Sequence, residues 1–262
     1  MGAVHAAGPA SSQRHGQVAV QVRELFKRRE QAGSAFELRV PELRLERGEF
    51  VAVVGESGCG KSTLLDILGL VLRPTSCELF AVHRPTQHGS QQVIDIKALW
   101  DREDEAGLAE LRRQHVGYVL QSGGLLPFLD VRRNILLPCR LNRRTGADLT
   151  VRRLAGRLGI RSLLAKKPQF LSGGQRQRVA ILRALAHDPM VVLADEPTGA
   201  VDKPRARAIV ADLRAVASER GSTVVMVTHD LDLVAAAAHR HYTFVVEEPS
   251  ETVTRSVCLP GS

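Results

Sequence analysis

Nine consecutive residues of this 262-residue chain have the types and spacing that bind phosphate. They match the pattern G-x-x-x-x-G-K-[ST] without a mismatch and read Gly55, Glu56, Ser57, Gly58, Cys59, Gly60, Lys61, Ser62 and Thr63. Glycines let the backbone turn tightly, so that successive N–H groups point at the phosphates, and the positive end of a following helix adds to this field. Lys61 would then reach the β- and γ-phosphates of a nucleotide, and the Ser62 hydroxyl would bind Mg²⁺. A glycine-rich turn without a ligand is the alternative, and Gly-Lys-Ser is a poor choice for such a turn.

Two carboxylates follow the apolar run 191–194 and form a second candidate centre. Asp195 stands at a strand end, where an acid holds Mg²⁺ through water, and Glu196 stands where a general base would polarise an attacking water. Acids are also common near helix starts, so the pair could instead cap the next element. The run Pro-Thr-Gly-Ala-Val-Asp over 197–202 favours the catalytic interpretation.

The segment 171–175, Leu-Ser-Gly-Gly-Gln, is the third feature with chemical meaning, and we call it the signature segment. A serine and two glycines at a helix start make another anion site, so the chain would have two. A histidine, His229, follows the apolar run 223–228 at the strand end where ligands of α/β proteins bind. A lone histidine at a strand end is more often structural, and the surrounding motifs favour a functional role here.

The elements that must position these groups are predicted by apolar periodicity. Strands are expected at 50–54, 191–194, 223–228 and 242–246, and alternation over 36–45 is typical of half-buried antiparallel strands. Helices are expected at 64–72, 175–187 and 231–240. Between 122 and 170 strand patterns vanish and arginine-rich helical segments take over, with Pro168 at their edge. The pattern indicates an α/β fold with a small β-subdomain and an inserted helical subdomain.

The order of these motifs resembles that of an ABC-type ATPase. It comprises the phosphate loop, Gln121 after the run 116–120, the signature segment, Leu-Ala-Asp-Glu-Pro-Thr-Gly over 193–199 and Val-Thr-His-Asp over 227–230. The likeness runs from about residue 18 to residue 246 and is greatest for the lipoprotein-release, macrolide-export and cell-division branch, through Ala-Asp-Glu-Pro-Thr-Gly and Leu125-Leu126-Pro127. It implies a P-loop NTPase (RecA-like) core with an antiparallel β-subdomain and an inserted helical subdomain.

The resemblance also implies roles for individual residues, with ATP and Mg²⁺ as cofactors. The catalytic residues would be Glu196, His229, Lys61 and Gln121. The metal ligands would be Ser62, Gln121 and Asp195. The branch usually has a tyrosine where adenine stacks, and Phe26 is the candidate here, with the same π-face but no hydroxyl. The other nucleotide contacts would be Gly55, Glu56, Ser57, Gly58, Cys59, Gly60, Lys61, Ser62, Thr63, Gln121, Ser172, Gly173, Gly174, Gln175 and Asp202.

In the family, the phosphate loop and the signature segment meet only between two protomers packed head to tail. The resemblance therefore implies a homodimer with two identical nucleotide sites. It also implies a separately encoded integral membrane permease as partner, and a cytoplasmic location at the inner face of the membrane. No stretch of the chain approaches the roughly 18 apolar residues of a membrane-spanning helix. A mechanotransmission subunit of the cell-division type remains an alternative that no sequence feature separates from an exporter.

Charge is unevenly distributed along the chain, whose formal net charge is +8. Residues 131–178 contain 13 Lys or Arg against one acid, Asp148. Such a basic stretch fits a face attracted to anionic lipid or to nucleic acid. It equally fits an ordinary solvated surface, because arginine outnumbers lysine 30 to 6 in the whole chain. A soluble ABC ATPase acting on nucleic acid is thus a rival, although no specific nucleic-acid partner is expected.

The domain boundaries follow from these patterns. Residues 17–248 are predicted to form the ATPase domain, with the helical subdomain at about 122–180. Residues 1–16 lack an apolar core and are predicted to be a disordered tail, and residues 249–262 a C-terminal tail. The four cysteines show no paired or metal-ligand spacing, which favours free thiols in a reducing compartment.

Overall fold

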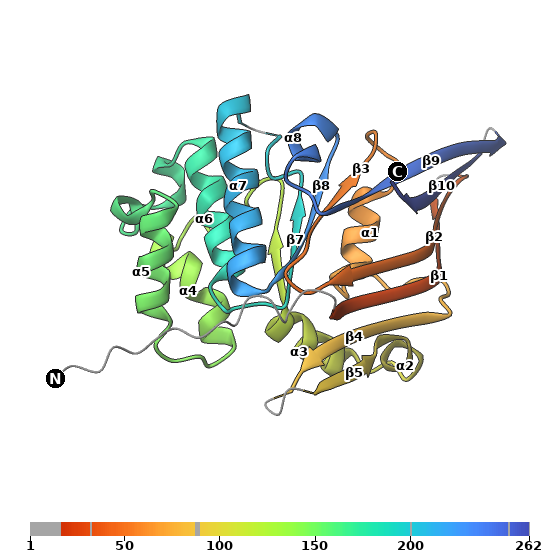
Figure 1. The fold of residues 1–262 in the computed structure, drawn as a ribbon, viewed down its shortest axis with the longest axis horizontal. Helices are drawn as coiled ribbons and strands as arrows, with labels where there is room; N and C mark the ends of the chain where they lie inside the picture. The colour runs from red at the N-terminus through yellow and green to blue at the C-terminus, as the bar shows by residue number, and fades with distance from the viewer. Residues whose placement is uncertain (1–16, 32, 87–89, 200, 251, 262) are drawn as a thin grey trace.

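A mixed β-sheet runs through the molecule and carries helices on both faces (Figure 1). The computed structural model describes residues 17–31, 33–86, 90–199, 201–250 and 252–261. Within them the sheet has ten strands, in the order β5-β4-β1-β2-β10-β9-β3-β8-β7-β6. The strands are β1 (Val18–Gln31), β2 (Ser34–Glu46), β3 (Phe50–Val54), β4 (Leu79–Pro85), β5 (Gln91–Asp95), β6 (Val116–Val119), β7 (Val191–Asp195), β8 (Thr223–Thr228), β9 (Arg240–Ser250) and β10 (Val253–Pro260). The helices are α1 (Lys61–Leu68), α2 (Ile96–Asp101), α3 (Glu105–His115), α4 (Val131–Leu141), α5 (Ala147–Arg157), η1 (Arg161–Leu163), η2 (Pro168–Phe170), α6 (Gly173–Leu185), α7 (Lys203–Arg220) and α8 (Leu231–Ala235).

The central part of the sheet is parallel and carries the predicted phosphate loop. Strands β6, β7, β8, β3 and β9 pair in parallel. Every residue of β3 and β8 is buried, as expected for parallel strands covered on both faces. The predicted strands at 50–54, 191–194 and 223–228 are confirmed. The carboxyl ends of β3, β7 and β8 therefore meet at one edge, which is where α/β proteins bind ligands.

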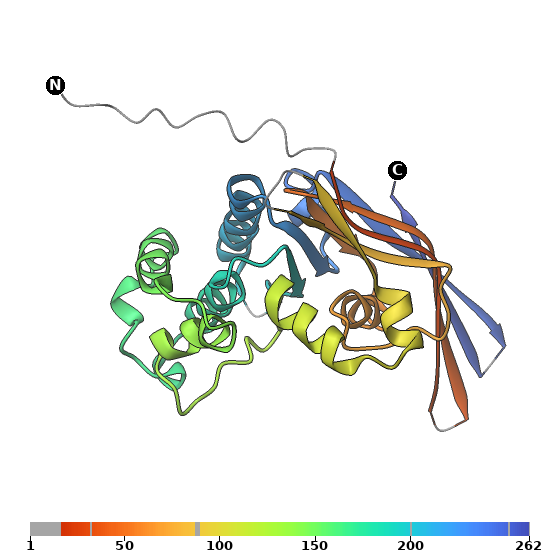
Figure 2. The ribbon, with the colours of Figure 1, turned by 90° about the horizontal axis from the view of Figure 1, so that it is seen from below.

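An antiparallel region extends the sheet on the other side. Strand β1 pairs antiparallel with β2 and with β4, and β4 with β5. The alternation over 36–45 belongs to the single strand β2, whose Leu38, Val40, Leu43 and Leu45 are fully buried. The predicted β-subdomain is confirmed, and its curvature encloses α1 (Figure 2).

The predicted C-terminal tail at 249–262 is corrected by β10. This strand pairs in parallel with β2 and antiparallel with β9, so it joins the antiparallel region to the core. Its Ser256 and Cys258 are fully buried, and the Ser256 hydroxyl donates to the carbonyl of Cys59 at 2.6 Å. The segment is ordered because its backbone pairs on both sides and alternate side chains enter the core. The other predicted tail, at 1–16, lies outside the described residues.

Helices cover the two faces of the sheet with separate apolar cores. Helix α1 buries Leu64, Leu65, Ile67 and Leu68 beneath the curved sheet, each contributing about 1.5–3 kcal/mol to folding. Helices α6 and α7 pack on the opposite face, with residues such as Leu213 of α7. Helix α8 is shorter than the predicted helix 231–240, and β9 is longer than the predicted strand 242–246.

The inserted helical subdomain is confirmed. Helices α4 and α5 and the short turn η1 share one core with the signature helix α6. Within it Asn134 is fully buried, and its side-chain amide donates to the carbonyls of Leu126, Leu129 and Asp130. Its Oδ1 accepts the N–H of Leu126 at 2.8 Å, so this one side chain fixes the segment that leads into α4.

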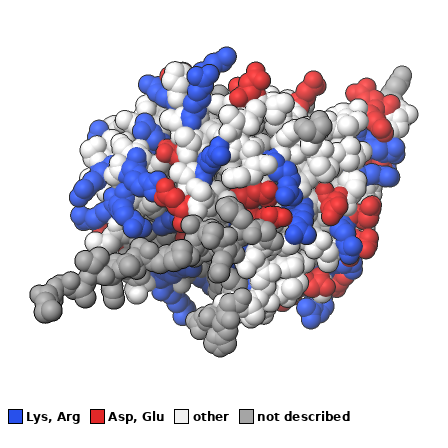
Figure 3. Space-filling view, in the orientation of Figure 1, with Lys and Arg blue, Asp and Glu red and all other residues white. Residues whose placement is uncertain are grey.

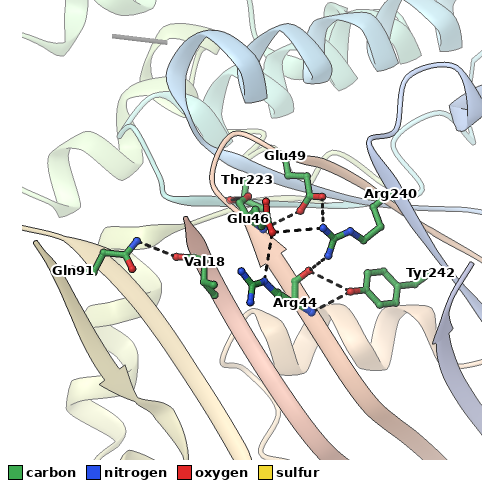
Figure 4. A network of polar contacts seen from close by, with 8 residues as sticks. All are labelled: Val18, Arg44, Glu46, Glu49, Gln91, Thr223, Arg240 and Tyr242. Carbon is green, nitrogen blue, oxygen red and sulfur yellow. Dashed lines mark hydrogen bonds and ion pairs between the residues drawn. The ribbon is translucent and has the colours of Figure 1, made fainter. Parts of the chain in front are cut away.

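A polar network fastens the start of β3 to its neighbours (Figure 4). The carboxylate of Glu49 is almost fully buried, accepts the N–H of Glu46 at 2.9 Å and pairs with Arg240 at 3.2 Å. The Tyr242 hydroxyl lies 3.1 Å from the backbone nitrogen and 3.2 Å from the carbonyl of Arg44. The turn that precedes the phosphate strand is thereby held by β9 and β2 together.

Candidate active site

A pocket of about 790 Å³ opens at the carboxyl ends of β3 and β7. Its lining includes most of the groups that the sequence predicted for phosphate and metal chemistry. They are Ser57, Gly58, Gly60, Lys61, Ser62, Thr63, Gln121, Asp195 and Glu196. The fold therefore brings together residues that lie up to 139 positions apart in the chain, between 57 and 196.

Lys61 sits at the base of this pocket, where its ammonium is held by the loop itself. The side chain is only 6% exposed, and Nζ donates to the carbonyls of Gly55 at 2.8 Å and Glu56 at 2.6 Å. Gly60 caps α1 in the left-handed region with φ of 101°, where a side chain would also collide with the ring of Phe36, 2.7 Å away. The backbone N–H groups of the α1 terminus and one fixed cation thus face the same space.

Three loop residues lie outside the pocket lining. Gly55 and Glu56 contribute the carbonyls that hold Lys61. Cys59 is 3% exposed, and burial raises the pKa of its thiol. Its Sγ packs toward Gly55, near Phe244, and therefore points inward.

Ser62 and Asp195 form a pair of oxygen ligands suited to Mg²⁺. The Ser62 hydroxyl donates to Oδ1 of Asp195 at 3.3 Å. Burial raises the pKa of the Asp195 carboxyl, and the nearby charge of Glu196 raises it further, while the Ser62 hydrogen bond lowers it. A divalent cation at this position would relieve the accumulated negative charge. Mg²⁺ usually takes one or two protein ligands and completes its shell with water and phosphate, so this small donor set fits.

Glu196 occupies a strained backbone position between a cation and a histidine. Its φ of 40° is unusual for a residue other than glycine and costs about 1–3 kcal/mol. Its N–H donates to the carbonyl of Val227 at 3.1 Å, which ties it to β8. The carboxylate lies 3.8 Å from Nζ of Lys61 and 3.3 Å from Nδ1 of His229. The side chain of His229 is 63% exposed, so it stands at the mouth of the site.

Gln121 lies beside the same carboxylate although it comes from the loop after β6. A Cβ placed on Gly199 would be 3.7 Å from Nε2 of Gln121 and 3.7 Å from Oε2 of Glu196. The two side chains thus flank one small space. A glycine at 199 keeps that space open.

The signature residues are not among those that line this pocket. Ser172 caps α6, its Oγ accepting the N–H of Gln175 at 3.3 Å while Oε1 of Gln175 accepts the N–H of Ser172 at 2.9 Å. Gly173 is the first residue of the helix, and Gly174 lines a different pocket, between α6 and α7. Asp202 caps α7 by accepting the N–H of Arg205 at 3.0 Å. Within the described part of one chain, these predicted contacts stay separate from the phosphate loop.

Comparison with known proteins decides the family. The family model described as "ABC transporter" matches residues 38–199, which is more than half of the chain and includes the phosphate loop, the signature segment and Glu196. The chain belongs to the ABC transporter family. The fold and the motif order predicted from the sequence are confirmed by this match.

Individual relatives and a solved structure support the same family. The chain is 37% identical over 191 residues to the bacitracin export ATP-binding protein BceA of Halalkalibacterium halodurans, covering 72% of this chain and 70% of BceA. It is 42% identical over 206 residues to the macrolide export ATP-binding/permease protein MacB of Salmonella choleraesuis, covering 76% of this chain but only 28% of MacB. The dimeric cassette MJ0796, solved in a post-hydrolysis state with ADP and Pi, superposes with a TM-score of 0.68 at 32% identity, covering 86% and 93% of the two chains. The protein is an ABC-type ATPase.

The aromatic residue in the described pocket lining of this ABC ATPase is Phe36, whereas Phe26 is the residue predicted from the sequence. Phe26, on β1, is absent from the described lining of the pocket, and its ring instead faces the guanidinium of Arg39 at 5.6 Å. Its backbone bonds to Ser76, which holds it on the outer part of the sheet. Phe36, on β2, lines the pocket, and its ring reaches Gly60. The prediction of Phe26 as the stacking residue is not supported by this geometry.

Four further lining residues had no signal in the sequence. They are Arg29, Ser34, Ala35 and Thr254. Thr254 belongs to β10 and pairs with Phe36 of β2. Only the tertiary pairing of strands from the two ends of the chain brings these residues to the nucleotide side of the loop.

Proposed function

We propose that this ABC ATPase hydrolyses Mg-ATP as a head-to-tail homodimer and thereby drives an integral membrane permease, from the cytoplasmic face of the membrane. The observation that carries the proposal is the convergence of Lys61, Ser62, Gln121, Asp195 and Glu196 on one pocket. The similarity to the export proteins BceA and MacB supports export as the output. Lipoprotein or peptide translocation is the corresponding substrate class for this branch, and a mechanotransmission output remains its alternative.

Each residue has a distinct chemical task in this proposal. The loop N–H groups and Lys61 bind the phosphates and stabilise charge on the transferred phosphoryl group. Glu196 accepts a proton from the attacking water, while Gln121 and His229 orient that water from either side of the carboxylate. Ser62, Asp195 and Gln121 would hold Mg²⁺. The metal, when bound, supplies positive charge to the phosphate oxygens.

The dimer is proposed because, within the described residues, the signature segment lies outside the lining of the pocket that holds the phosphate loop. Ser172 at the signature helix start is exposed and already pre-organised by its capping box, with backbone N–H groups of α6 free to face an anion. A second copy related by a twofold axis would present this end of α6 to the nucleotide on Lys61. The dimeric state of MJ0796 supports this arrangement.

A membrane partner is proposed over a nucleic-acid partner. Among the described residues, no helix has the length and apolarity needed to cross a bilayer. Lys and Arg gather over the region of α4, α5 and α6 (Figure 3). Several of them are paired locally, as Arg132 and Arg152 are with Asp148 and Arg157 is with Glu219. This local pairing favours a protein-facing or solvated surface over a phosphate-binding stripe.

The test combines capture with activity. The Glu196→Gln variant, held in its ATP state, is used to isolate an integral membrane protein, which is then reconstituted with the parent protein in liposomes. We expect ATP hydrolysis to rise with that membrane protein and to stay constant with RNA or DNA. Stimulation by RNA or DNA without any membrane protein would overturn the proposal, as would an absence of hydrolysis in every condition.

A further inference from the structure

Arg183, on the signature helix α6, is hydrogen-bonded to the loop that begins with Gln121. One terminal nitrogen donates to the carbonyl of Gly124 at 2.6 Å, and the other donates to the carbonyl of Gly123 at 2.9 Å. The two acceptors are consecutive carbonyls two and three residues after Gln121. A guanidinium is the side chain that can satisfy two neighbouring acceptors with one rigid fork.

The loop that begins with Gln121 has a backbone conformation that directs the carbonyls of Gly123 and Gly124 toward α6. Gly123 and Gly124 have φ of 75° and 56°, which places both in the left-handed region. Gly123 donates to the carbonyl of Leu120 at 2.9 Å, closing a tight turn over Gln121. A Cβ on Gly123 would lie 3.7 Å from Cβ of Ala180, so this backbone packs directly on α6. The loop and the helix therefore move as one body wherever these bonds persist.

The electrostatics of Arg183 are unusual for a purely structural arginine. Burial lowers the pKa of its guanidinium, and no ion pair with a carboxylate is recorded for it within the described residues. Gln177 of the same helix also lies near Gly123; it is 6% exposed, and its buried Nε2 has no hydrogen-bond partner in the described chain. A partly buried charge that is held by two carbonyls is sensitive to any displacement of them. The contact thus favours one relative position of loop and helix.

We propose that Arg183 is a positioning residue that couples the placement of Gln121 to the placement of the signature segment. Arg183 and Ser172 lie on one continuous helix, about 16 Å apart along its axis at 1.5 Å per residue. When Gln121 moves to or from the space beside Glu196, the signature end of α6 is carried with it. The position of Gln121 in the phosphate site of one protomer and the position of the signature segment offered to its partner then depend on the same two hydrogen bonds of Arg183. This inference rests on the proposed function, because it requires Gln121 and Ser172 to act in hydrolysis.

The first test is a double-mutant cycle on the hydrolysis rate. Arg183→Met removes both donors while keeping an apolar stem, and we expect kcat to fall about 10- to 100-fold with nucleotide affinity of the monomer unchanged. Gln121→Ala should lower kcat by a similar factor. If Arg183 acts through Gln121, the double variant has the kcat of Gln121→Ala alone. Losses that multiply in the double variant would overturn the proposal.

A matched control separates positioning from stability. Arg220, on α7, also donates to a carbonyl of α6, that of Leu185 at 3.0 Å, and it pairs with Asp188 at 3.4 Å, and neither contact involves the loop residues 121–124. Arg220→Met should lower thermal stability by as much as Arg183→Met and leave kcat within about twofold. Equal losses of kcat in both variants would show a structural role only and would overturn the proposal.

Further outcomes distinguish the inference from the function on which it rests. Arg183→Lys, which offers one donor group in place of the fork, should fold and give an intermediate kcat, so it serves if Arg183→Met does not fold. A parent-like kcat in Arg183→Lys and in Arg183→Met would overturn the coupling role while leaving ATP hydrolysis intact. A parent-like kcat in Gln121→Ala would overturn the coupling role together with the task assigned to Gln121. Inactivity of the parent protein itself would instead remove the proposed function.

Discussion

Replacing Glu196 by glutamine tests the chemistry of the site with the smallest change in shape. The substitution keeps the side-chain volume and both hydrogen-bonding positions, but it removes the negative charge and the basic oxygen. Its carboxylate lies 3.8 Å from Lys61 and 3.3 Å from His229. The other carboxylate in the described pocket lining, Asp195, is hydrogen-bonded to Ser62. A general base contributes about 10²- to 10⁴-fold to rate, which corresponds to about 2.7–5.4 kcal/mol of activation free energy. We therefore expect kcat to fall at least about 100-fold.

Nucleotide binding should survive the same substitution. Lys61 keeps its two carbonyl contacts, and the loop N–H groups do not involve Glu196. Losing the nearby negative charge should leave the phosphates bound at least as well as before, because like charges no longer repel. The variant should therefore accumulate as an ATP-bound dimer on size exclusion, with nucleotide affinity by calorimetry within about threefold of the parent.

The assay is phosphate release under saturating Mg-ATP, with Glu196→Asp as a matched control that keeps the charge but shortens the reach. A Glu196→Gln rate within a few-fold of the parent would refute the assignment of this carboxylate as the base. A large loss of nucleotide affinity would refute the separation of binding from chemistry argued from the contacts of Lys61.

Three other outcomes follow from the geometry. Lys61→Ala should weaken ATP binding about 10- to 100-fold in calorimetry, because charge-assisted hydrogen bonds contribute about 1.5–3 kcal/mol, and unchanged affinity would contradict the phosphate-loop assignment. Phe36→Ala should weaken ATP binding by about 1 kcal/mol or more, because a base stack is lost, and should leave tripolyphosphate binding unchanged. Phe26→Ala should leave the binding of both ligands unchanged. The reverse pattern would restore Phe26 as the stacking residue. Burial lowers the pKa of His187 to about 4, below its ordinary value, so the folded state favours the neutral imidazole. The contribution of His187 to the free energy of unfolding is therefore complete above about pH 6.5 and is lost as pH falls toward 4. In urea titrations the free energy of unfolding should be about 2 kcal/mol lower at about pH 5 than at pH 7.5. The His187→Phe variant should show no such loss.

The parts of the site that sequence could predict are those written in contiguous residues. The phosphate loop carries its own glycines, lysine and hydroxyl, so its geometry depends on neighbours in the chain. Asp195 lies at the end of β7, as the end of the apolar run at residue 194 predicts, and Glu196 follows it directly. The same local logic located His229 after β8 and Ser172 at the start of α6.

The parts that it could not predict depend on pairing between distant strands. Phe36 alternates with Leu38 and Val40, and this pattern indicates only that the three side chains point to the buried face of a strand. Near the first residues of β2, that face is turned toward Gly60. Thr254 lies in a stretch of mixed polarity that has no strand signal of its own and becomes a strand by pairing with β2 and β9. The alanine-rich stretch after residue 231 predicted a longer helix than α8, because alanines favour a helix without specifying where it ends.

The insertion of β10 between β2 and β9 also constrains how the chain can be made. Arg255 of β10 bonds to Glu37 of β2 across 218 positions. At about 5–20 residues per second, a ribosome needs roughly 10–40 s to cover that separation, and for this time the inner edge of β2 has no partner from β10. An unpaired edge is a template for pairing with another chain, so nascent copies are vulnerable to aggregation until the late strand arrives. Slow, non-local closure of this kind predicts that the yield of folded protein depends on translation speed and on chaperones that shield strand edges more than on the stability of the finished domain.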